Sequence, residues 1–133
     1  MAGTIAADTL THSTAGSLTT DYVVNGSAKV WINHDKNPEN TNDSFNVSSV
    51  TDVGIGVSTY NLTNSMSNAN YTALISAGGG MSFATGKLFG SNGTNGVTAP
   101  TSSAFNQVTG YATNSGNVTD ADYNTAAVFG DLA

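Results

Sequence analysis

The stretch SFNVSSVTDVGIGVSTYNLTNSMSNANYTALIS, residues 44–76, alternates apolar and polar side chains in short runs broken by Asn, Asp, Gly and Ser. Alternation with a period of two is typical of antiparallel strands that bury one face. Residues 45–50 and 57–62 predict a hairpin around a glycine-containing turn, and residues 71–76 predict a further strand. The stretch therefore predicts an all-β fold.

The flanking sequence continues this pattern. Residues 28–32 place Ala28, Val30 and Ile32 on one face and Lys29 and Trp31 on the other, which predicts a half-buried strand. The segment HDKNPENTND, residues 34–43, contains Pro38 and no apolar residue, so we expect a solvated loop.

The C-terminal third supplies the remaining strands. Residues 105–113 and 123–129 predict the last two strands around the turn Asn114-Ser115-Gly116, and residues 90–103 predict a surface loop. No amphipathic helix of ten residues is predicted. The fold class that follows is a compact antiparallel β-sandwich or jelly-roll-like domain.

The chain has few residues with which to build a core. Its length of 133 residues predicts one domain, yet Leu, Ile, Val and Phe together number only 26. A thinly cored chain gains stability by oligomerisation, because a subunit interface adds apolar burial. We therefore expect a homo-oligomer.

The N-terminal segment differs from the rest. Residues 1–20 contain Thr, Ser, Ala and Gly with widely spaced apolar residues, namely Ile5, Leu10 and Leu18, and cannot form a core of their own. We predict an extended N-terminal docking arm over residues 1–25, in which these three residues make the contacts, and a β-sandwich domain over residues 26–133.

Composition excludes several functional classes. The net charge of −6, with three Lys and no Arg, weighs against a nucleic-acid partner, because binding needs cationic side chains. Membrane insertion is not expected, since no stretch approaches roughly 18 consecutive apolar residues. The N-terminus lacks the cationic flank and apolar run of a signal peptide, so we expect synthesis in the cytoplasm.

The residues that most often carry catalysis are scarce. Both histidines, His12 and His34, are predicted to be solvated bystanders. The segment Gly80–Leu88 resembles a phosphate-binding loop only superficially, because its glycine spacing is wrong. Glu39 is the only Glu, which disfavours a pair of glycosidase carboxylates. We expect no catalytic residues and no cofactor.

Two binding alternatives deserve weight. Asp35, Asn37, Glu39 and Asp43 are oxygen ligands of the kind that Ca²⁺ prefers, but the required glycine at the sixth loop position is Asn40, so no metal site is predicted. Aromatic residues on strands, among them Trp31 and Tyr60, predict an oligomer interface or a surface contact such as a sugar-stacking platform.

Three ordered segments resemble a known family. GSAKVWIN (26–33), DSFNVSSVTDVGIGVSTYNLTNSMSNANY (43–71) and VTDADYNTAAVFGD (118–131) are similar to a recurring module of tailed bacteriophages, common in marine phages. The family occurs as tail-fibre C-terminal domains and as small virion proteins. The resemblance implies a phage structural protein with a compact β fold, often displayed as a trimer, and it implies no catalytic residues.

The resemblance also implies which partners to expect. They are the chain itself, as a homotrimer, other virion proteins of the capsid or tail, and a host surface glycan or receptor. Because residues 81–113 match the family poorly, we place a candidate recognition loop there, with Asn92, Thr94 and Asn95 as contacts. The expected location is the virion, as a capsid decoration, head-fibre or short tail-fibre subunit. The alternative is a receptor- or glycan-binding tip.

Overall fold

The computed structural model describes residues 3, 6–36, 38–78, 84–88, 99–111 and 118–133. These residues form ten strands and one short helix: β1 (Thr9–His12), β2 (Gly16–Thr19), α1 (Thr20–Gly26), β3 (Val30–Lys36), β4 (Glu39–Phe45), β5 (Val47–Gly54), β6 (Val57–Leu62), β7 (Thr72–Gly78), β8 (Ala84–Leu88), β9 (Ala104–Tyr111) and β10 (Tyr123–Phe129). The prediction of an all-β fold is confirmed.

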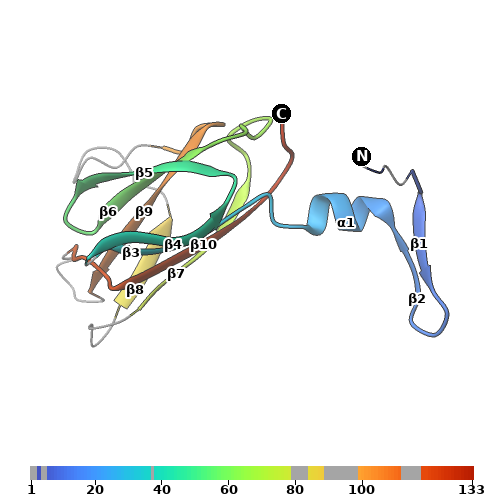
Figure 1. The fold of residues 1–133 in the computed structure, drawn as a ribbon, viewed down its shortest axis with the longest axis horizontal. Helices are drawn as coiled ribbons and strands as arrows, with labels where there is room; N and C mark the ends of the chain where they lie inside the picture. Colours follow the sequence, from blue (N-terminus) through green and yellow to red (C-terminus); the bar gives the residue numbers. More distant parts are fainter. Residues whose placement is uncertain (1–2, 4–5, 37, 79–83, 89–98, 112–117) are drawn as a thin grey trace.

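Two four-stranded antiparallel sheets form a β-sandwich (Figure 1). The strand order is β4-β3-β10-β7 in the first sheet and β5-β6-β9-β8 in the second. Strands β9 and β10, predicted as neighbours around one turn, lie in different sheets. The predicted turn itself, Asn114-Ser115-Gly116, lies outside the described residues.

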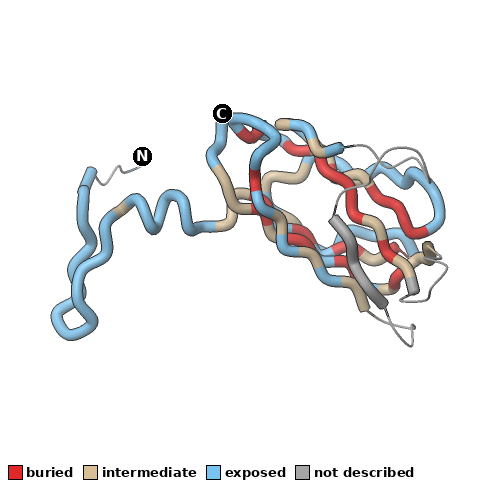
Figure 2. The backbone as a smooth tube through the Cα atoms, turned by 180° about the vertical axis from the view of Figure 1, so that it is seen from behind, coloured by how far each residue is buried: buried red, intermediate tan, exposed pale blue. Residues whose placement is uncertain are grey.

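The core lies between the two sheets (Figure 2). Because side chains alternate along each strand, every second residue points inward. The buried apolar cluster combines residues of both sheets and of the connections: Val30, Ile32, Tyr60, Leu62, Met66, Tyr71, Phe105, Ala126 and Val128. Polar side chains complete the interior, among them Ser58, Asn106, Gln107, Thr109 and Asn124.

Asn46 is the corner at which the chain passes from one sheet to the other. It lies between β4 and β5 and has φ 59°, a left-handed conformation that Asn tolerates better than most residues. Its side-chain amide donates to the Lys29 carbonyl at 3.2 Å and to the Asn64 carbonyl at 3.0 Å. Its Oδ1 accepts from the Asn64 backbone N–H at 2.7 Å. These bonds hold the two sheets together at this corner.

The strand predicted at residues 28–32 is confirmed, but its extent is not. Strand β3 begins at Val30 and continues to Lys36, so residues 34–43 are not a solvated loop. They are a hairpin of β3 and β4, and the interior face of β3 runs from Val30 and Ile32 on to His34 and Lys36. The prediction that His34 is a solvated bystander is therefore wrong.

The N-terminal arm stands away from the sandwich (Figure 1). Residues 6–27, which we call the arm, comprise the β1-β2 hairpin and α1, and all of them are exposed apart from Thr20, which is intermediate. Asn25 and Gly26 form the last turn of α1.

Candidate functional site

The arm is held together by few contacts. In the hairpin, Leu10 pairs with Leu18 on one face, while Thr11 and Ser17 join their hydroxyls at 3.0 Å on the other. Thr20 connects the hairpin to α1, because its backbone N–H donates to the Asp8 carbonyl at 2.9 Å. One face of the hairpin thus carries Leu10, Leu18 and His12, the other carries Thr and Ser, and both are exposed.

Lys29 holds the root of the arm to the sandwich through several hydrogen bonds. The Lys29 ammonium donates to the Val24 carbonyl and, at 2.9 Å, to the Ser27 carbonyl, which satisfies carbonyls at the end of α1. The Lys29 backbone N–H donates to the Val128 carbonyl of β10 at 2.8 Å. Lys29 therefore connects the helix directly to the first sheet.

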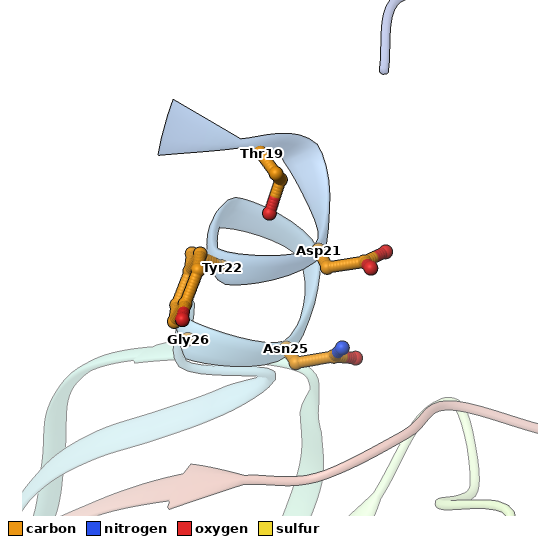
Figure 3. A pocket seen from close by; sticks show the side chains of 5 residues that line it. All are labelled: Thr19, Asp21, Tyr22, Asn25 and Gly26. Carbon is orange, nitrogen blue, oxygen red and sulfur yellow. The ribbon is translucent and has the colours of Figure 1, made fainter. Parts of the chain in front are cut away.

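A hollow on α1 is lined by Thr19, Asp21, Tyr22, Asn25 and Gly26 (Figure 3). Asp21 and Asn25 point to one side of the helix and Tyr22 points to the other. The side chains do not converge on one point, as the polar groups of a small-molecule site do. The hollow is the exposed surface of an unpartnered helix.

The arm has little stability of its own by the length of its elements. Isolated helices shorter than about 12 to 15 residues are marginal in water, and α1 has seven residues, two of them β-branched valines. A lone two-stranded hairpin is also marginal, and β1 and β2 have four residues each. Leu10, Leu18, Tyr22, Val23 and Val24 are all exposed large hydrophobic side chains.

A second apolar surface lies on the outer face of the first sheet. The strand register places Phe45 beside Trp31, Trp31 beside Ala127, and Ala127 beside Leu74. We call these four residues the apolar row. Its three large side chains are exposed, at 53% for Phe45, 38% for Trp31 and 62% for Leu74. Phe129, half-buried on the same face of β10, extends the surface toward the arm.

Polar residues border the row on the side away from the arm. The next outward-facing positions along the four strands are Asp43, Asn33, Thr125 and Ser76. An aromatic and aliphatic centre with a polar rim is the usual anatomy of a protein interface. The row begins two residues after the point at which Lys29 attaches the arm to the sheet.

The two aromatic contact residues predicted from the sequence lie in different environments. Trp31 is exposed on the outer face of the first sheet. Tyr60 is 0% exposed, so its assignment to an interface or surface contact is wrong. Its ring packs against Phe105 with a centroid distance of 5.1 Å, and its hydroxyl donates to Gln107 Oε1 at 3.0 Å. Burial raises the pKa of Tyr60.

The other predicted contacts are only partly placed. Leu10 and Leu18 are brought together on the hairpin, as described above. Ile5, and the recognition-loop residues Asn92, Thr94 and Asn95, lie outside the described residues. The sequence did not indicate Phe45 and Leu74 as surface contacts, although both are apolar residues on strands.

One group of ionisable side chains lies at the end of the sandwich far from the arm. The buried Lys36 ammonium is 2.5 Å from Asp52 Oδ1, 3.9 Å from Asp120 Oδ1 and 3.2 Å from the Val57 carbonyl. The hydrogen bond from Lys36 holds the pKa of Asp52 below its usual value. Asp52 and Asp120 also accept the backbone N–H groups of Gly54 and Gly56. The carboxylates act as turn caps and as counter-ions to Lys36.

His34 neighbours this group in the interior. Burial lowers the pKa of His34, and its ring meets Tyr60 edge-on at a centroid distance of 6.0 Å. His34 Nδ1 is 3.2 Å from Thr41 Oγ1 on the neighbouring strand β4, so the ring bonds to the first sheet rather than to Lys36 or Asp52. Among the described residues, no group of three or more His, Asp or Glu side chains could hold a metal ion.

Within the described part of the chain, no helix is long and apolar enough to cross a bilayer. Comparisons with models of protein families, with curated proteins and with solved structures found no match to this chain.

Proposed function

We propose that this chain is a non-enzymatic structural protein of a phage virion, displayed on the particle as a homotrimeric surface subunit. It would serve as a capsid decoration or head-fibre protein, or as a short tail fibre. The observation that carries the proposal is the exposed arm, whose hydrophobic side chains and marginal secondary structure need a neighbouring protein.

The apolar row supports an assembly role independently of the arm. Two apolar surfaces on one small domain provide two contacts, and a subunit of a closed ring or shell needs at least that many. The ionisable residues support the same conclusion, because Lys36, Asp52 and His34 serve packing and turn formation. The resemblance of residues 26–131 to phage virion modules is the reason for proposing that the assembly is a phage particle.

The arm gives the sharpest test of this function. A phage whose gene for this chain lacks codons 2–25 would be grown beside the wild type, and the protein in purified particles would be quantified by mass spectrometry. We expect loss of the protein from the particle while the truncated sandwich still folds. The matched control is Ile55→Ser, which removes an exposed hydrophobic side chain from the β5–β6 turn. Incorporation of the truncated chain at the wild-type level would refute arm docking.

The alternative function is a glycan- or receptor-binding tip on the same virion. Trp31 favours it, because an exposed indole beside polar Asn33 and Asp43 is the chemistry of a sugar-stacking surface. Saturable binding of the purified protein to host cells, lost on Trp31→Ala, would support this role. Averaged cryo-electron microscopy density at the capsid or at the tail would place the protein on the particle.

A further inference from the structure

The arm and the apolar row are two unpartnered apolar surfaces of one chain. We propose that they are partners of each other in trans, so that the arm of one copy packs on the apolar row of a second copy. The inference rests on the proposed function and deepens it, because it names the neighbour on which the arm docks. The argument comes from the arm's direction, its size and its chemistry.

The direction of the arm prevents it from covering its own row. Only Ser27 and Ala28 separate the end of α1 from Lys29, which is already hydrogen-bonded to β10. The Lys29 ammonium holds the carbonyls of Val24 and Ser27, and Ser27 is extended with φ −82° and ψ 143°. The arm consequently leaves the end of the sandwich and extends away from it (Figure 1). A short connection that prevents docking in cis favours exchange between copies.

The dimensions of the two surfaces match. The row crosses four strands and therefore spans about 14 Å, because neighbouring strands lie about 4.8 Å apart. Each strand of the hairpin has four residues, which corresponds to about 13 Å. A standard interface uses about 20 to 30 residues on each side, and the arm of residues 6–27 supplies a segment of that size.

The chemistry of the two surfaces also matches. The Leu10–Leu18 pair of the hairpin is apolar, with His12 next to it on the same face, and the row of Phe45, Trp31, Ala127 and Leu74 is apolar as well. The opposite Thr/Ser face of the hairpin would remain in water after docking.

Head-to-tail exchange of arms is a heterologous contact, and it closes only if each arm reaches the next copy around a ring. A closed ring of three copies would bury three arms and three rows and leave neither surface free. The exchange therefore gives the proposed homotrimer a specific contact. In the same step the unstable hairpin and helix become ordered against a rigid sheet.

Sedimentation velocity of the purified full-length chain tests the exchange in the absence of any other particle protein. The wild type should sediment as a trimer at micromolar concentration. Leu18→Ser in the arm and Leu74→Ser in the row should each raise the concentration needed for half-assembly at least tenfold. Ile55→Ser is the matched control and should leave it unchanged, since Ile55 is an exposed hydrophobic residue remote from both surfaces. Near-ultraviolet circular dichroism verifies that each variant is folded.

A cross-linking experiment identifies the two surfaces that meet. The chain has no Cys, so copies carrying only Leu18→Cys can be mixed with copies carrying only Leu74→Cys and treated with a short bis-maleimide. We expect a mixed cross-linked dimer, and far less from a mixture of Leu18→Cys with Ile55→Cys. Equal yields from the two mixtures would overturn the exchange.

The possible failures are distinguishable. A wild-type monomer at all concentrations that still enters particles through its arm would overturn the exchange and the homotrimer. It would assign the arm to a different particle protein and leave the proposed role as a virion structural protein intact. An oligomer insensitive to Leu74→Ser would also overturn it. A monomer whose row binds a purified host glycan would overturn it in favour of the adhesive role.

Discussion

The substitution Tyr60→Phe removes one buried hydroxyl and tests whether polar bonds hold the two sheets together. Tyr60 lies on β6, and its hydroxyl donates to Gln107 Oε1 on β9 at 3.0 Å. The Gln107 amide then reaches the other sheet, where Nε2 is 3.0 Å from the Ser76 carbonyl and 3.4 Å from Asn124 Oδ1. Phe retains the ring and its contact with Phe105, so the apolar burial is unchanged.

The expected magnitude follows from what Gln107 can do afterwards. The Gln107 amide cannot flip to place Nε2 where the Tyr60 hydroxyl was, because the flip would break the bonds from Nε2 to Ser76 and Asn124. Its Oε1 would lose the Tyr60 donor within the core, and an unsatisfied buried acceptor costs about 1 to 3 kcal/mol. For a chain of this size each 1 kcal/mol lowers the Tm by about 4 °C, so Tyr60→Phe should lower it by about 4 to 12 °C.

Thermal unfolding followed by far-ultraviolet circular dichroism measures this effect. All samples must have the same protein concentration, because an oligomer has a concentration-dependent Tm. Tyr123→Phe is the matched control: Tyr123 is exposed on β10, and its change should stay within about 0.5 kcal/mol. If the two variants lose the same stability, the reasoning is refuted and the Tyr60 hydroxyl contributes nothing to the contact between sheets.

Three further predictions concern other contacts of the fold. Asn46→Ala should destabilise the chain more than Asn46→Gly. Both variants lose the side-chain bonds to Lys29 and Asn64, but Ala is also strained by the backbone φ of 59°. Equal urea midpoints for the two variants would contradict this. Gly56→Ala should cost about 2 to 5 kcal/mol in urea unfolding, because a Cβ there would lie 2.5 Å from the Thr109 carbonyl oxygen at a φ of 66°. Burial lowers the pKa of His34 below 6.5, so its contribution is complete above that pH and is lost as the pH falls toward the folded pKa. The Tm measured against pH should therefore decline below about pH 6.5, and His34→Gln should flatten that decline.

The strand pattern was predictable wherever apolar residues alternate. The expected hairpin forms as β5 and β6, because the run carries enough Val, Leu and Tyr for the period to be visible, but β5 is Val47–Gly54 rather than residues 45–50. The polarity of His34 and Lys36 predicts exposed side chains, but both lie in the interior. Both lie in phase with Val30 and Ile32, at steps of two, so the period alone could have placed them inside.

Other features depended on contacts that no local pattern encodes. Lys36 is buried because its stem lies in the core while its ammonium reaches Asp52, which is sixteen residues away in sequence. Helix α1 is too short for a periodicity argument and is capped by Lys29 from beyond its end. The apolar row could be predicted only from the register of four strands. Two of them, β7 and β10, are separated in sequence by β8 and β9, which belong to the other sheet.

The distribution of apolar residues connects the thin core to assembly. Among the described residues, twelve large hydrophobic side chains are exposed and eleven hydrophobic residues, two of them alanines, are buried. Much of the interior is polar and hydrogen-bonded, as at Gln107 and Asn124, so the sandwich folds with few aliphatic residues. Five of the exposed side chains lie on the arm, and three lie on the apolar row. These two surfaces hold most of the exposed large hydrophobic side chains, which is why we propose that contacts between copies supply the packing that this fold lacks inside.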